Sequence, residues 1–181
     1  MAGDNTKLSS SVTVARYRAL EAADDRATLA HFVCERFDER YFNPIENSTS
    51  THGFASLAVA CLVIETLESF YEGREDTRSV SSQMFSDFFR RDTPLKALGA
   101  GGGWFYTDIR CGILHQAEAR GGWRVIRTGP LLDTATRAIN ATKVLRQLQI
   151  AVRAYAEAIR TDDALWVLFK KKMKAVCANC A

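Results

Sequence analysis

The chain has 181 residues, of which 47% are hydrophobic and 25% charged, and its formal net charge is +3. This length fits a single domain, 1–181, which can bury a core without disulfide or metal support, and the composition is ordinary for a soluble globular protein. The small positive charge favours an anionic partner too weakly to identify one.

The N-terminal segment 1–11 has no apolar core and no cleavage pattern, so we expect a flexible N-terminus and no signal peptide there. The chain has five cysteines, an odd number, and Cys34, Cys61 and Cys111 fall in expected helices. This usage argues against a disulfide framework and for a reducing compartment. The longest apolar run, 57–64, is well short of the roughly 18 residues that span a bilayer. We therefore expect a cytoplasmic protein without membrane contact.

Helical patterns follow one another through the first half of the chain. Apolar residues recur at approximately helical spacing over 12–42, and this pattern ends before Asn43-Pro44. The segment 53–71 is apolar on most sides and ends before Gly73, which is typical of the buried central helix of a bundle. A shorter helix is expected over 79–92, where serines can cap its start.

The second half continues this pattern with one interruption. A helix is expected from Phe105 to about Ala119, followed by a small hairpin around Gly129-Pro130. Asp133-Thr134 can cap a long helix that runs through Arg160. A last helix is expected over 163–175, with a frayed C-terminus at 176–181. The sequence thus predicts an all-α antiparallel helical bundle with one small β-hairpin.

Two short motifs could hold a ligand. The loop GAGGGW (99–104) precedes a helix, where phosphate can bind, but it lacks the Lys-Ser/Thr of a P-loop and the third glycine of a dinucleotide site. A flexible connection is the simpler interpretation. Cys177 and Cys180 have the spacing of a metal-binding pair, but a structural zinc site needs four ligands and no second pair exists. We expect no metal and no cofactor.

A basic run, Lys170, Lys171 and Lys172, follows Trp166 near the C-terminus. Lysines at the end of a helix interact favourably with its dipole, so a solvated helix end explains them. The alternative is an auxiliary contact to RNA phosphates.

Arg110 and His115 lie on the helix expected over 105–119. With 100° per residue, one face of this helix is apolar and the opposite face carries Asp108, Cys111, His115 and Glu118. Arg110 lies about 140° around the axis and about 7.5 Å along it from His115. One helix therefore does not bring the two side chains together, although Gly112 between them permits close packing from outside.

The segment IRCGILHQAE resembles the R-x4–6-H motif of the HEPN superfamily, small helical-bundle proteins that include RNases of toxin–antitoxin and phage-defence systems. The resemblance implies a four-helix HEPN-like core with the motif on a late helix. The family often has a polar residue directly after the arginine, where this chain has Cys111.

The resemblance also implies a function and a partner. In similar proteins two subunits pair through this region, so that Arg110 and His115 of both chains line one cleft. The expected chemistry is metal-independent RNA cleavage by the 2′-OH, with His115 as acid or base and Arg110 on the phosphate. Asp108 could orient His115, and Glu65 or Glu68 could hold Arg110. A nucleotidyltransferase-like protein is a candidate antitoxin.

Two other interpretations remain open. A catalytically inactive module of the same family would bind RNA, nucleotide or a partner protein, and Cys111 and the modest basic charge favour it. In a plainer alternative, Arg110 merely pairs with a buried glutamate of the bundle.

Overall fold

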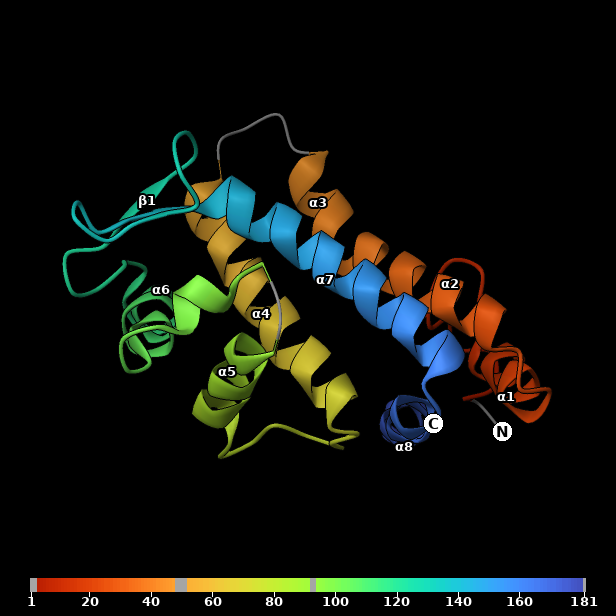
Figure 1. The fold of residues 1–181 in the computed structure, drawn as a ribbon. Helices are drawn as coiled ribbons and strands as arrows, with labels where there is room; N and C mark the ends of the chain where they lie inside the picture. The colour runs from red at the N-terminus through yellow and green to blue at the C-terminus, as the bar shows by residue number, and fades with distance from the viewer. Residues whose placement is uncertain (1–2, 48–51, 92–93, 181) are drawn as a thin grey trace.

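The computed structural model describes residues 3–47, 52–91 and 94–180, and these are mostly helical (Figure 1). The helices are α1 (Val14–Ala22), α2 (Arg26–Phe37), the π-helix η1 (Asp38–Phe42), α3 (Asn43–Glu46), α4 (Gly53–Tyr71), α5 (Ser81–Arg90), the 3-10 helix η2 (Lys96–Gly99), the π-helix η3 (Phe105–Arg110), α6 (Cys111–Gln116), α7 (Ala141–Thr161) and α8 (Asp163–Ala178). The strands are β1 (Arg124–Ile126), β2 (Leu132–Asp133) and β3 (Ala138–Asn140). The predicted all-α bundle with a small β element is confirmed.

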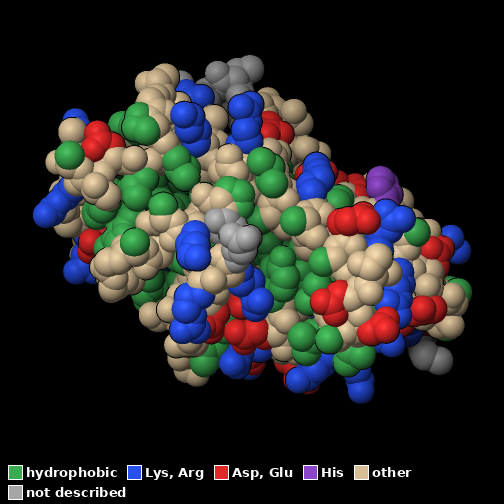
Figure 2. Space-filling view, viewed as in Figure 1, with side chains coloured by type: hydrophobic (Ala, Val, Ile, Leu, Met, Phe, Trp, Pro, Cys, Tyr) green, Lys and Arg blue, Asp and Glu red, His purple; other side chains and the backbone are tan. Residues whose placement is uncertain are grey.

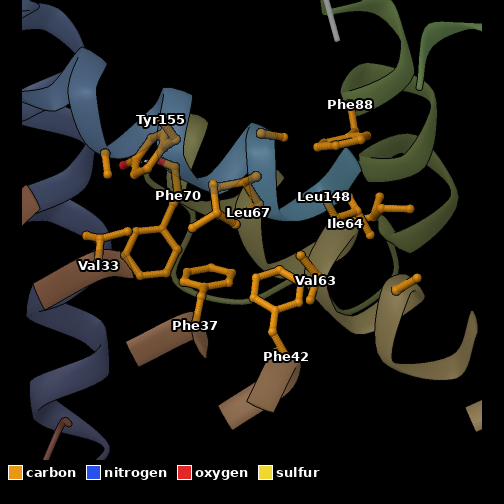
Figure 3. Close-up of a cluster of buried hydrophobic side chains, with 14 of the residues drawn as sticks. Val33, Phe37, Phe42, Val63, Ile64, Leu67, Phe70, Phe88, Leu148 and Tyr155 are labelled. Carbon is orange, nitrogen blue, oxygen red and sulfur yellow. Dashed lines mark hydrogen bonds between the residues drawn. The ribbon is translucent and has the colours of Figure 1, made fainter. Parts of the chain in front are cut away.

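Helix α4 is the centre of the bundle. It packs against α5, α7 and α8, while α2 packs along α7 (Figure 1). The side chains that fill the space between these helices are large and fully buried, among them Phe37, Phe70 and Tyr155 (Figure 3). Burial of side chains this large is the main favourable contribution to folding, at roughly 25 cal/mol per Å² of apolar surface.

Helix α4 is also the one described helix that is long and apolar enough, by length and composition alone, to cross a membrane. More than half of its apolar window, 56%, is buried inside the protein by neighbouring helices. The central helix of a bundle is apolar on most sides because other helices cover it, and α4 fits this description.

The N-terminal third differs from the single helical pattern expected over 12–42. Asp24 adopts a left-handed conformation (φ 51°), and the carboxylate of Asp25 accepts a hydrogen bond from Thr28 N at 3.0 Å. This turn and new N-cap separate α1 from α2, since aspartate is among the preferred N-cap residues. Two helices can then pack side by side where one long helix could not.

Both chain ends are packed, in contrast to the flexible N-terminus (1–11) and frayed C-terminus (176–181) that the sequence suggested. Leu8 is fully buried, and Cys177 is 5% exposed. The hydroxyls of Ser9 and Ser10 donate to Glu35 at 2.6 and 2.9 Å. Thr6 Oγ1 donates to the carbonyl of Cys180 at 3.2 Å, which joins the two ends (Figure 1). Residues 1–2 and 181 lie outside the described part.

The β element is a three-stranded sheet in the order β1-β3-β2, where we expected a hairpin around Gly129-Pro130. Strand β1 pairs with β3 in parallel, and β2 pairs with β3 antiparallel. The antiparallel pair turns at 134–137, where the Asp133 carboxylate accepts from the backbone N–H groups of Ala135 and Thr136.

The start of the long helix α7 also differs from the expected cap at Asp133-Thr134. Asp133 is the last residue of β2, and the side chain of Asn140 caps α7 by accepting from Lys143 N at 3.1 Å. Asn140 is itself the last residue of β3 and fully buried. The helix therefore begins directly where the sheet ends.

Candidate functional site

The helix that carries Arg110 and His115 consists of two parts. Residues 105–110 form the π-helix η3, and α6 continues from Cys111 but ends at Gln116 instead of near Ala119. Ala117 adopts a left-handed conformation (φ 56°), and the chain turns back along the helix it has just left. Short π-helical segments within helices are rare and are frequently found at functional sites.

The returning segment 118–121 packs against the motif helix. Arg120 N donates to the carbonyl of Asp108 at 2.8 Å. A Cβ on Gly112 would stand 2.5 Å from the carbonyl oxygen of Glu118, so no other residue fits there without displacing backbone. Gly112 thus permits close packing, as predicted, but the packed partner is the chain's own return segment.

Arg110, the last residue of η3, is partly buried, and its side chain faces Glu65 of α4 and Tyr106 of η3. Its Nη2 lies 3.8 Å from Oε2 of Glu65, and its guanidinium lies 5.4 Å from the centre of the Tyr106 ring. The side chain is 21% exposed, and that of Glu65 is 20% exposed. Arg110 is therefore oriented from both sides while its charge stays accessible to a ligand.

Glu65 is in turn fixed by two hydroxyl groups. Thr77 Oγ1 donates to Oε1 at 2.5 Å, and Ser81 Oγ donates to Oε2 at 2.6 Å. The other glutamate considered for Arg110, Glu68, lies elsewhere: it is fully buried and accepts two hydrogen bonds from Arg91, at 2.7 and 2.5 Å. Of the two glutamates, the structure places Glu65 beside Arg110.

A cavity of about 360 Å³ opens at Arg110, and we call it the Arg110 cavity. Its lining residues come from α4, the segment after it, η3 and α8: Leu62, Glu65, Thr66, Ser69, Asp76, Thr77, Arg78, Arg110 and Lys172. Three cationic groups, one of them on α8, thus share one cavity with several hydroxyls and with the carboxylates of Glu65 and Asp76, of which Asp76 pairs with Arg78 at 2.8 Å. Cationic groups and hydroxyls are the side chains that contact phosphate oxygens in nucleic-acid complexes.

The lysine run is divided between two places. Lys172 lines the Arg110 cavity, and its Nζ donates to the carbonyl of Glu75 at 3.1 Å. Burial lowers the pKa of Lys172, an effect that nearby Asp76 opposes. Lys170 lies over the ring of Trp166, and Lys171 is exposed on a groove of α8 that faces α1. Only Lys172 is near Arg110.

His115 is exposed on α6, and no hydrogen bond or ion pair holds it among the described residues. Asp108 does not orient it: the Asp108 carboxylate lies against Gly121 of the returning segment, 2.8 Å from where a Cβ there would stand. Cys111 is half-buried. One chain therefore presents Arg110 at a cavity and His115 on the surface without joining them.

Cys61 lies on the α4 side of this region. Burial raises the pKa of the Cys61 thiol to about 12, although the positive charge of Arg110 opposes this rise. The thiol is accordingly a neutral packing group and no nucleophile.

No protein-family model, curated protein or solved structure matches this chain. The residues of the site must therefore be interpreted from their own chemistry. Among the described residues, no three His, Cys, Asp or Glu side chains lie close enough to hold a metal ion. Figure 2 shows acidic and basic side chains interspersed over one face, without a continuous basic stripe.

The sequence analysis did not identify three residues that shape the site, namely Tyr106, Thr77 and Arg78. Tyr106 comes four residues before Arg110, a spacing that places two helical side chains on one face. Thr77 and Arg78 carry no signal of this kind, because only the turn after α4 brings them to Glu65 and Arg110.

Proposed function

We propose that this protein is a metal-independent endoribonuclease of the HEPN type, active as a homodimer in the cytoplasm. The observation that carries the proposal is the environment of Arg110. Its guanidinium is oriented by Glu65 and Tyr106 at a cavity that also holds Lys172, and an exposed histidine follows on the same helix. In RNA cleavage by the 2′-OH, a positioned arginine can stabilise the charge on the phosphate and an exposed imidazole can transfer a proton.

The chemical roles follow from the properties of the two groups. The 2′-OH of the RNA attacks the adjacent phosphorus, and His115 accepts its proton as a general base. The bond between phosphorus and the 5′-oxygen breaks, and the leaving oxygen takes up a proton. The permanently charged Arg110 stabilises the phosphorane oxygens. The expected products carry a 2′,3′-cyclic phosphate and a 5′-hydroxyl.

A second subunit supplies the convergence that one chain lacks. Leu114, one turn after Arg110 on α6, is 46% exposed, and Leu62, which lines the Arg110 cavity, is 50% exposed. Single exposed leucines are common, but two beside a candidate site support an interface there. In a two-fold dimer His115 of one subunit would approach Arg110 of the other.

A specific observation favours a second candidate, a catalytically inactive RNA-binding module. Within one chain, Arg110 lies at a cavity and His115 is exposed on the surface, and the structure does not bring the two side chains together. Under this alternative, the same cavity binds RNA phosphates and no strand is cut. An antitoxin of the nucleotidyltransferase-like kind is compatible with either candidate.

The test is cleavage of labelled RNA by the purified protein, in the presence of EDTA, with product ends identified by mass spectrometry. We expect wild-type cleavage to survive EDTA, and Arg110→Ala and His115→Ala each to lower its rate by roughly 10²–10⁴-fold.

The matched control is His31→Ala, which removes another exposed histidine, on α2. It should cleave like the wild type, and circular dichroism should show all variants folded. Unchanged cleavage in His115→Ala would rule out His115 as the acid or base, and RNA binding without cleavage by the wild type would leave the binding module.

A further inference from the structure

Tyr106, whose ring lies 5.4 Å from the Arg110 guanidinium, also lines a second pocket, of about 310 Å³. Phe85, Phe89, Phe105 and Tyr106 form its aromatic wall, and we call it the aromatic pocket. The three phenylalanines belong to the core and are at most 5% exposed, so they hold the half-buried Tyr106 in place, and Tyr106 is the ring of this wall that a ligand can contact. Its size is at the small end for ligand sites, which suits a single planar ring system.

The rim of the aromatic pocket is polar. Ser82, Gln83 and Ser86 lie on the exposed face of α5 and line its edge with hydroxyl and amide groups. An aromatic wall with hydrogen-bonding groups at the edge matches a nucleobase, which has an apolar π face and a polar perimeter.

The glycine-rich loop forms the opposite side of the pocket. Gly102 and Gly103 have φ angles of 82° and 83°, and a Cβ on either would meet no atom, so their conformation and not packing requires glycine. Trp104 fixes this loop: its ring stacks on Trp123 at 3.8 Å, and its Nε1 donates to Ala100 O at 2.9 Å. The pocket is therefore formed before any ligand binds.

We propose that the aromatic pocket binds one unpaired base of an RNA strand whose phosphate lies at Arg110. Tyr106 is the shared element, because its ring lines the pocket and also contacts the Arg110 guanidinium. A base and its own phosphate are covalently joined, so neighbouring sites for the two bind a strand better than either alone. The proposal rests on the RNA-binding function above and adds to it a site that selects single-stranded RNA.

The experiment uses a fluorescent RNA octamer with 2′-O-methyl groups throughout, which cannot be cut by 2′-OH attack, and measures its affinity by fluorescence polarisation. Ser86→Phe fills the pocket from an exposed position and should weaken binding about tenfold, the contribution of one stacked base. Ser82→Phe, one turn earlier, provides a second plug. Ala154→Phe, on the exposed face of α7, adds the same ring elsewhere and should bind like the wild type.

Octamers that lack one base at a defined position separate the possible outcomes. Removal of the base at one position should weaken wild-type binding about tenfold and leave Ser86→Phe binding unchanged, because the variant has already lost that contact. Equal affinity of wild type, Ser86→Phe and Ser82→Phe for the intact octamer would overturn the base pocket alone. No binding of the octamer by the wild type would overturn the proposed function together with the pocket.

Discussion

Two glutamates of α4 each pair with an arginine from another segment, and burial gives the two pairs different roles. Glu68 is fully buried and accepts two short hydrogen bonds from Arg91, whose guanidinium also lies 4.2 Å from the centre of the Tyr71 ring. Glu65 and Arg110 are each about one-fifth exposed, and their charged groups are 3.8 Å apart. The Glu68 carboxylate is therefore inaccessible and tightly bound by Arg91, whereas the longer contact to Glu65 leaves Arg110 able to exchange partners.

The Glu68 pair leads to a prediction about stability and pH. Burial raises the pKa of Glu68, although the hydrogen bonds and charge of Arg91 oppose the rise. The folded protein therefore holds the Glu68 proton to higher pH than the unfolded chain does. The contribution of Glu68 to the free energy of unfolding therefore falls as the pH rises from its pKa in the unfolded chain to its pKa in the folded protein.

Arg91→Gln removes the group that lowers the Glu68 pKa, so the pKa of Glu68 in the folded protein should rise further. The fall in stability with increasing pH should then continue to higher pH than in the wild type. We expect the variant to lose about 3 kcal/mol at pH 8, the low end for a broken buried pair because Arg91 is itself 35% exposed, and less at pH 5. Urea denaturation at both pH values measures this. The double variant Arg91→Gln/Glu68→Gln buries no charge, and its pH dependence over this range should be weaker. An equal loss at pH 5 and pH 8 would contradict the argument.

At the scale of elements, the end of α6 depends on backbone contacts that no helical pattern describes. The chain reverses at Ala117 and returns over Gly112, where the Glu118 carbonyl leaves no room for a Cβ. Gly112 costs about 1 kcal/mol of helix propensity relative to alanine, and the return segment explains why it is there.

Two opposite substitutions test this description of α6. Gly112→Ala should lower the free energy of unfolding by about 1–2 kcal/mol, because overpacking against backbone exceeds the gain in helix propensity. Ala117→Gly should raise it by about 0.5–1 kcal/mol, because glycine adopts the left-handed conformation without strain. Chemical denaturation measures both. A more stable Gly112→Ala variant would show that the return segment moves freely.

At the scale of the whole molecule, the proposed dimer makes a prediction about exposed leucines. Leu62 and Leu114 flank the Arg110 region, while Val167 on α8 is even more exposed, at 59%. Leu62→Lys or Leu114→Lys should weaken dimerisation at least about 100-fold, because a lysine without a partner would be buried at the interface. Val167→Lys, the control, should leave the dimer intact.

Sedimentation equilibrium over a range of protein concentrations measures the association. RNA cleavage should fall in parallel with the dimer, since the proposed active site contains residues of both subunits. A wild-type protein that stays monomeric at all accessible concentrations would exclude the composite site.

The fold class follows from local sequence properties. The apolar segment 53–71 has the same bounds as the central helix α4. Its central position was also predictable, because a helix that is apolar on most sides must be surrounded by others. The break between α1 and α2 also had a local cause in Asp24-Asp25, but a continuous apolar repeat concealed it. Periodicity reports burial along a helix, and caps decide where it stops.

For the site, the sequence identified Arg110 and His115 as candidates, whereas their surroundings depend on the tertiary structure. Glu65 is 45 positions before Arg110 and Lys172 is 62 positions after it, and only the packing of α4, η3 and α8 brings them together. The aromatic pocket likewise joins α5, the glycine loop and η3. Helix and strand patterns depend on residues that are neighbours in the sequence. Cavities depend on contacts between residues that are far apart in the sequence, and no residue spacing in a single sequence predicts those contacts.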